Sequence, residues 1–121
     1  MSISRRLGQR WTDEELIVVL DLRLNHGLND GHNHDAIAKC LGRYSPVTNS
    51  WKDGPVNQKL SEIIGMLNQS RAKRHSGNKI EALLKRYEKN LPALRREAKK
   101  SWPNILRTHS GSVPKDVQRL L

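Results

Sequence analysis

A polar segment between positions 43 and 61 carries side chains that can read DNA bases. Asn and Gln amides form bidentate hydrogen bonds with adenine, whereas Arg and Lys bind guanine or phosphate oxygens. Both kinds of side chain occur in this segment together with hydroxyl groups. The candidate DNA-contacting residues are Arg43, Thr48, Asn49, Lys52, Asn57, Gln58, Lys59 and Ser61. Polar side chains on a solvent-facing surface need no partner to explain them, so that simpler interpretation stays open for each residue.

The formal net charge of +10 arises entirely in the second part of the chain. Residues 1–70 contain eight Lys/Arg and eight Asp/Glu, whereas residues 71–121 contain fourteen Lys/Arg and four Asp/Glu. Such asymmetry is typical of a surface that binds phosphates or anionic lipid, and the alternative is a solvated basic face without a partner. Because no membrane-insertion pattern accompanies the charge, nucleic acid is the favoured partner. The residues expected to supply affinity are Arg86, Lys89, Arg96, Lys99 and Lys100.

Three apolar-periodic segments are expected to position the polar segment. A first helix is predicted from Thr12 to His26, with a capping box between Thr12 and Glu15 and with Gly27 at its end. A short helix is predicted over 34–41 and a longer one over 55–68, where apolar residues recur at i, i+4, i+7, i+8 and i+11. A short helix, a glycine corner and a longer helix are the layout of a helix-turn-helix, whose last helix can enter a DNA groove.

The basic part of the chain predicts two further helices, over 78–90 and from about 93 to 102. Pro92 is expected to interrupt them and Pro103 to end the second. An apolar stripe with heptad-like spacing follows Leu84, Tyr87, Leu91, Leu94 and Ala98. This stripe either packs on the first part of the chain or pairs with another chain, which would make a homodimer.

The predicted fold class is therefore all-α, a three-helix helix-turn-helix-type bundle with a basic helical C-terminal extension. The expected division of the chain is a core with a basic N-terminal arm over 1–70 and a basic helical extension or linker over 71–121, which a further, catalytic domain could follow in a longer protein. At 121 residues with 36% hydrophobic residues and no Phe, the chain suits a small helical bundle rather than a protein with a deep catalytic cleft.

Enzymatic, metal-binding and membrane functions are not expected. Zinc could be held by His26, His32, His34 and Cys40, but the chain lacks a CxxC or HxxxH pair. No Gly-rich phosphate loop or nucleophile elbow occurs, so no catalytic residues, metal or cofactor are predicted. No apolar run approaches the roughly 18 residues that span a bilayer. With its single cysteine, the chain suits a reducing compartment, the cytoplasm or, in a eukaryote, the nucleus.

Residues 10–67 resemble a known class of DNA-binding domain. The run WTDEEL at Trp11–Leu16, followed by Ile37-Ala38 and by Leu41-Gly42-Arg43, is similar to the Myb/SANT-type three-helix domain. More narrowly, the same run with the LGR corner and PVNQKLSEI resembles the N-terminal helical segment of bacterial HNH-type restriction endonucleases. The resemblance implies a module that binds double-stranded DNA, as the recognition domain of a restriction-type nuclease or as a regulator.

Two other classes of function stay open from the sequence. SANT-like domains also bind proteins, so a protein-interaction adaptor is the main alternative, with the stripe from Leu84 to Ala98 as its docking surface. RNA binding is less favoured, because the few aromatic residues are scattered through apolar stripes rather than gathered as a stacking platform.

Overall fold

The computed structural model describes residues 11–29, 34–41, 54–68, 79–109 and 115–119. Within these ranges every regular element is a helix, which confirms the all-α class for the described residues. The elements are α1 (Asp13–Leu24), α2 (Asp35–Cys40), α3 (Pro55–Leu67), α4 (Lys79–Tyr87), α5 (Leu91–His109) and α6 (Lys115–Gln118).

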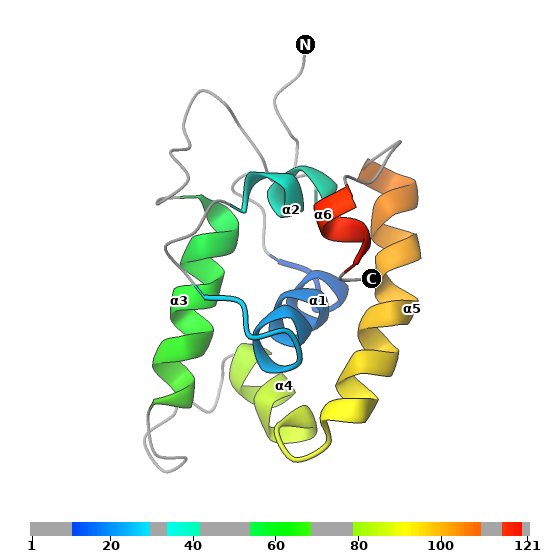
Figure 1. The fold of residues 1–121 in the computed structure, drawn as a ribbon. Coiled ribbons are helices and arrows are strands. Elements are labelled where there is room, and N and C mark those ends of the chain that lie inside the picture. Colours follow the sequence, from blue (N-terminus) through cyan, green and yellow to red (C-terminus); the bar gives the residue numbers. More distant parts are fainter. Residues whose placement is uncertain (1–10, 30–33, 42–53, 69–78, 110–114, 120–121) are drawn as a thin grey trace.

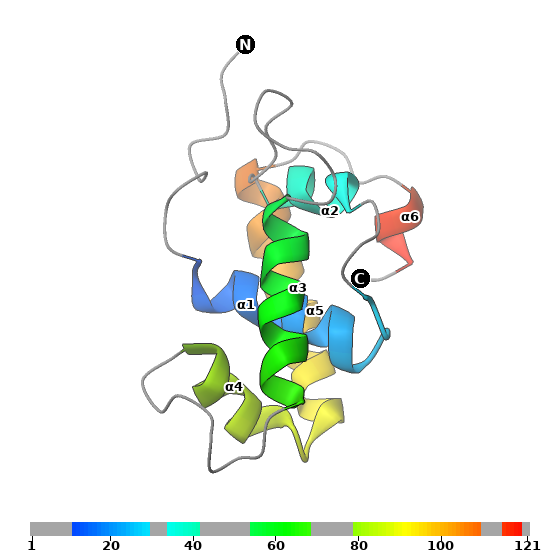
Figure 2. The ribbon, with the colours of Figure 1, turned by 90° about the vertical axis from the view of Figure 1, so that its left-hand side faces the viewer.

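The central element is α1, which passes between α3 on one side and α5 on the other (Figures 1 and 2). Every residue from Glu15 to Leu22 is buried, so α1 is enclosed around its whole circumference. A helix that is buried all round has no solvent face and must be covered by its neighbours. In Figure 1 these are α3 and α5 at its sides, α4 below it and α2 above it.

Local sequence signals fix the start of α1 as expected, whereas its end, predicted at His26, lies two residues earlier at Leu24. The Thr12 backbone N–H donates to Glu15 Oε1 (2.9 Å), and the Glu15 N–H donates to Thr12 Oγ1 (3.2 Å), which completes the predicted capping box. At the other end, Gly27 adopts a φ of 68°, where a side chain would be strained, and its N–H donates to the Arg23 carbonyl (3.1 Å).

A single hydrophobic core joins both parts of the chain. Buried side chains of α4 and α5 pack in the same cluster as those of α1, α2 and α3. Leu84, Leu94 and Ala98 are each 0% exposed, so most of the apolar stripe lies inside the fold. Of the two outcomes predicted for this stripe, packing on the first part of the chain is the one observed, and the expected homodimer surface is not exposed.

The core therefore differs from a three-helix bundle that carries a detached extension. α1 is covered by α4 and α5 from beyond residue 70 as well as by α2 and α3. The corner between α2 and α3, residues 42–53, lies outside the described residues. The helix-turn-helix arrangement accordingly stays a prediction, whereas the part of the chain from α4 onward belongs to the fold.

Two prolines mark α5, and only the first acts as the sequence predicts. Asn90 Oδ1 accepts a hydrogen bond from the Ala93 N–H (3.3 Å), so the Asn90 side chain caps the helix. Pro92 then lies in the first turn, where its missing N–H is not needed. The prediction that Pro103 ends the helix is wrong, because α5 continues to His109.

The position of Pro103 explains why the helix continues. Its ring removes the hydrogen bond to the Lys99 carbonyl, but Pro103 is exposed, and water can bind such a carbonyl. Beyond it, Ile105 is buried in the core. Packing on α1 thus outweighs one missing backbone hydrogen bond.

Besides the capping residue Glu15, a second buried carboxylate, Asp21, interrupts the apolar surface of α1. Asp21 is 0% exposed, and Arg95 of α5 donates a hydrogen bond to its Oδ2. Asn25 Nδ2 donates to Asp21 Oδ1 (2.7 Å) and to the Leu91 carbonyl (3.2 Å). A buried carboxylate without such partners would cost several kcal/mol. Asp21 therefore fixes both the position and the rotation of α5 on α1.

Removing Arg95 should destabilise the fold far more than removing its neighbour Arg96. Arg95→Ala leaves the carboxylate of Asp21 buried without its cation, which costs on the order of 3 kcal/mol. Arg96→Ala changes an exposed side chain and should alter stability by less than about 0.5 kcal/mol. Urea unfolding followed by circular dichroism measures both values, and equal transition midpoints for the two variants would contradict this role of Arg95.

Candidate nucleic-acid interface

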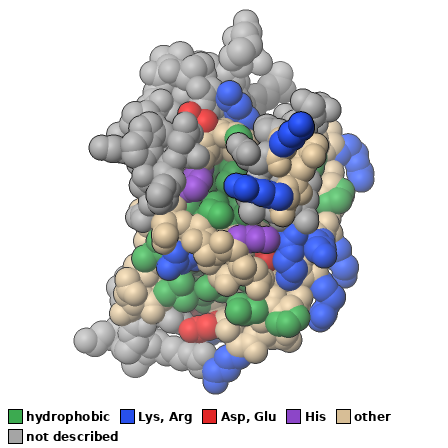
Figure 3. Space-filling model, in the orientation of Figure 1, with side chains coloured by type: hydrophobic (Ala, Val, Ile, Leu, Met, Phe, Trp, Pro, Cys, Tyr) green, Lys and Arg blue, Asp and Glu red, His purple; other side chains and the backbone are tan. Residues whose placement is uncertain are grey.

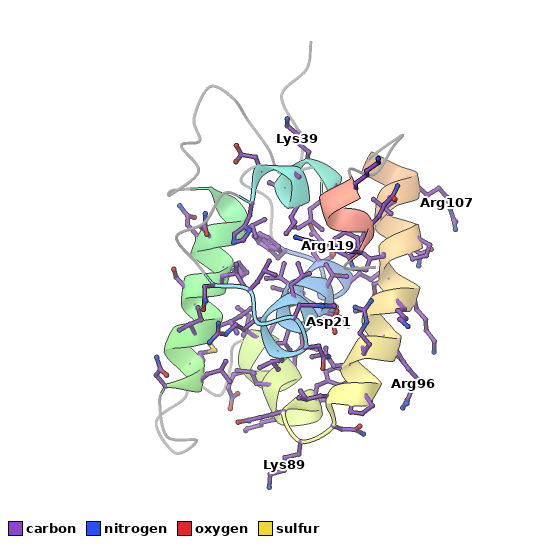
Figure 4. All side chains as sticks on the ribbon, viewed as in Figure 1. Asp21, Lys39, Lys89, Arg96, Arg107 and Arg119 are labelled. Atoms are coloured by element: carbon purple, nitrogen blue, oxygen red, sulfur yellow. The ribbon has the colours of Figure 1, made fainter. Side chains whose placement is uncertain are left out.

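The outward face of α5 is a continuous row of cations. Its buried side is formed by Leu94, Ala98, Trp102 and Ile105, which recur every three or four residues. Positions half a turn away from this stripe face solvent. We name the exposed cations there the basic face of α5: Arg96, Lys99, Lys100 and Arg107. Figure 3 shows Lys and Arg side chains gathered along the flank that α5 forms, and in Figure 4 Arg96 and Arg107 point away from the molecule.

Most of these cations are not neutralised by the protein. Among the described residues, Arg96, Lys99 and Arg107 form no ion pair, while Lys100 Nζ lies 3.6 Å from Glu97 Oε1. Glu97 is the one acidic residue in the sequence of α5, which contains five Lys and Arg residues. The face therefore carries a net positive charge that an anionic partner could neutralise.

Two further cations border this face from the end of α4. Lys89 is exposed at the turn between α4 and α5 and points away from the body in Figure 4. Arg86 is exposed beside the Tyr87 ring, with its guanidinium 5.9 Å from the ring centroid. The other two cations of α4 are paired, Lys79 with Asp13 (3.4 Å) and Lys85 with Glu81 (3.1 Å). All five basic residues expected to supply affinity are thus exposed.

The candidate DNA-contacting residues on α3 differ in how exposed their side chains are. Gln58 and Ser61 are exposed, as expected for residues that could meet a partner. Asn57 is 3% exposed and engages other groups of the protein, so the expectation that it faces a DNA groove is corrected. It lies one residue after Val56, at the edge of the stripe that packs toward the core, and its side chain turns inward with that stripe.

Lys59 on α3 is already occupied within the protein. Its Nζ lies 2.9 Å from Glu62 Oε2 and 5.4 Å from the centroid of the Trp11 ring, and its side chain is 18% exposed. To bind a phosphate, Lys59 would have to give up both contacts. The residues Arg43, Thr48, Asn49 and Lys52 lie outside the described residues, so their role stays a prediction.

The described candidate residues on α3 and the basic face of α5 lie on opposite sides of α1. α1 separates α3 from α5, and the exposed faces of these two helices point away from each other (Figures 1 and 2). A straight duplex that lies on the basic face of α5 cannot also touch Gln58 and Ser61. The sequence pattern assigned base reading to the segment 43–61 and affinity to the basic extension, and the fold places the described members of the two sets, Gln58 and Ser61 on α3 and the basic face of α5, apart.

The described potential zinc ligands are not grouped as a metal site. His34 Nε2 lies 2.8 Å from the Asn29 carbonyl, and His26 Nε2 lies 3.6 Å from Asp21 Oδ2. Cys40 is buried, and burial raises the pKa of its thiol, which disfavours the thiolate that binds metal. His32 lies outside the described residues. Within the described ranges, no three His, Cys, Asp or Glu side chains are grouped as metal ligands would be.

Sequence reasoning missed Arg107, because Pro103 was expected to end the helix before it. The signal was present in the spacing, since Arg107 lies seven residues after Lys100 and eleven after Arg96, on the same helix face. Two further cations are also exposed: Lys115, the first residue of α6, and Arg119, the residue directly after α6.

No known protein family matches this chain, and neither curated protein sequences nor solved structures give a significant match. No helix in the described part of the chain has the length and apolar character needed to cross a bilayer. The interface is therefore interpreted from the geometry of the chain itself.

The neighbours Asn57 and Gln58 should differ in their effect on stability. Asn57→Ala removes a buried polar group and leaves its surroundings unsatisfied, which lowers the free energy of unfolding by about 1–3 kcal/mol. Gln58→Ala alters an exposed side chain and should change it by less than about 0.5 kcal/mol. Urea titration of the two variants tests this difference. An Asn57→Ala variant as stable as the unmodified protein would mean that Asn57 has no structural role.

Proposed function

We propose that this chain is a module that binds double-stranded DNA through phosphate contacts to the basic face of α5. The observation that carries the proposal is that the cations of α5 and its buried apolar stripe occupy opposite sides of the helix. Cations occupy the side opposite the buried stripe, and most form no ion pair with other described residues. Phosphate contacts of this kind supply most of the affinity of non-specific DNA binding.

The length of the basic face suits several phosphates of one duplex. Arg96 and Arg107 are eleven residues apart, about 16 Å along the helix axis. Phosphates of one strand follow each other at about 3.4 Å along the duplex axis, so this length spans about five of them. With Lys89 before Arg96, the row of cations extends along nearly the whole of α5.

The three aromatic residues that the structure describes favour a duplex over a single strand. Proteins that bind single-stranded nucleic acid stack bases on exposed aromatic rings. Tyr87 and Trp102 are buried, and Trp11 is partly buried beside Lys59, so these rings are not offered on the basic face. A duplex, whose bases are already stacked, needs only the phosphate contacts that the basic face can supply.

The alternative function, a protein-interaction adaptor, has less support, because its predicted docking surface is mostly buried. Its docking stripe consists of Leu84, Tyr87, Leu91, Leu94 and Ala98, most of which are buried in the chain's own core. The resemblance to HNH-type restriction endonucleases gives the proposal a finer form, in which the chain is the DNA-contacting part of such a nuclease or of a regulator.

Binding to any duplex should weaken steeply with salt. If Arg86, Lys89 and the basic face of α5 together neutralise about six phosphates, affinity should fall about a thousandfold between 50 and 200 mM salt. Fluorescence anisotropy with a labelled duplex measures this fall. A single strand of the same length and vesicles with anionic lipid serve as comparisons, and tighter binding to either would contradict the proposal.

Removing two cations from the basic face should weaken binding without unfolding the protein. Lys99→Ala with Lys100→Ala removes two phosphate contacts, so the slope of log affinity against log salt should flatten by roughly two. The matched control is Lys39→Ala with Lys79→Ala, which removes the same charge from exposed positions on α2 and α4. If both double variants weaken binding equally, net charge rather than the basic face of α5 governs the interaction.

A further inference from the structure

We infer that the basic face of α5 binds the phosphate backbone from outside the grooves and therefore reads no base sequence. This inference rests on the proposed function and specifies the class of ligand, a duplex of any sequence. It depends on three observations about α5, namely which side chains are exposed, how its two flanks are fixed to α1, and where the nearby carboxylates lie.

The exposed chemistry of α5 is suited to phosphates. The outward positions hold Pro92, Pro103 and the four cations of the basic face. The one amide after the first turn, Asn104, donates from Nδ2 to Glu14 Oε2 of α1 (3.1 Å) and is not directed at a partner. Amides that could read adenine are therefore missing from this face, and guanine could be read only by its two lysines and by Arg96 and Arg107.

The cations of the basic face could reach guanine only if α5 entered the major groove. The groove is about 12 Å wide, close to the diameter of a helix with its side chains, so a reading helix must protrude from its domain. α5 is instead joined to α1 along both flanks. Arg95 donates to the buried carboxylate of Asp21 on one flank, and Asn104 donates to Glu14 on the other.

One flank of the basic face is also acidic. Glu97 lies on the same side of α5 as Asn104, whose partner Glu14 is exposed, so two carboxylates border the cations there. A helix that entered a groove would bring these carboxylates against the phosphates of the groove wall, and like charges at close range repel. Shallow contact with one phosphate row keeps the cations near phosphate and the carboxylates away from it.

Glu97 consequently limits the affinity of the face, because it also holds Lys100. Glu97→Gln removes a negative charge from the flank and releases Lys100 from its ion pair at 3.6 Å. The variant should bind every duplex more tightly, with the salt slope steeper by about one. Glu62→Gln on α3 makes the same change of charge on the far side of α1 and should leave the slope unchanged.

The deciding experiment measures the dissociation constants of the full chain for several duplexes of equal length and unrelated sequence at one salt concentration. A second arm selects bound sequences from a pool of randomised duplexes. The expected result is dissociation constants equal within about threefold and no enriched motif, since specific sites exceed non-specific ones by about a thousandfold or more. A strongly preferred sequence, or a Glu97→Gln variant that gains affinity for one sequence alone, overturns the inference and leaves duplex binding intact. Failure to bind any duplex at low salt would instead reject the proposed function itself.

Discussion

The whole arrangement depends on the burial of α1 on every side. Its side chains from Leu16 to Leu22 include five aliphatic residues with at most 4% exposure. Each contributes about 1.5–3 kcal/mol when removed from water, a sum comparable to the net stability of a small domain. No single neighbouring helix can cover a full circumference, so α3, α4 and α5 are all required. This requirement makes the basic part of the chain a component of the fold.

The contact between Asp21 and Arg95 links that packing to the proposed function. Burial alone would allow α5 to rotate somewhat, because aliphatic contacts are not directional. A hydrogen-bonded ion pair is directional, and Arg95 must face the buried carboxylate. Since successive helical residues are about 100° apart, this contact turns Arg96 and Arg107 to solvent. Adjacent arginines thus have opposite roles, Arg95 inside the fold and Arg96 on its surface, and no composition count could distinguish them.

Local signals were predictable from the sequence, whereas the mutual placement of helices was not. The capping box of α1, the turn at Gly27 and the start of α3 at Pro55 follow from residue types within a few positions. The continuation of α5 past Pro103 depends on burial of Ile105, which is a tertiary contact. The burial of Asn57 depends likewise on what packs against α3. The apolar periodicity of residues 12–26 predicted a helix there, but not that helices from beyond residue 70 would help to enclose it on all sides.

The separation of α3 from α5 decides which helix could meet a duplex first. Two interhelical spacings of about 8–10 Å each lie between their axes, roughly twice the Debye length of about 10 Å at 0.1 M salt. The positive potential of the basic face of α5 therefore attracts anions to its own side of the molecule and is largely screened on the other. The described surface of α3 offers little attraction of its own, since Lys59 is paired with Glu62. A duplex bound at the basic face of α5 would therefore lie on the far side of α1 from α3, so the recognition-helix role predicted for α3 is a separate prediction that needs a second contact with DNA.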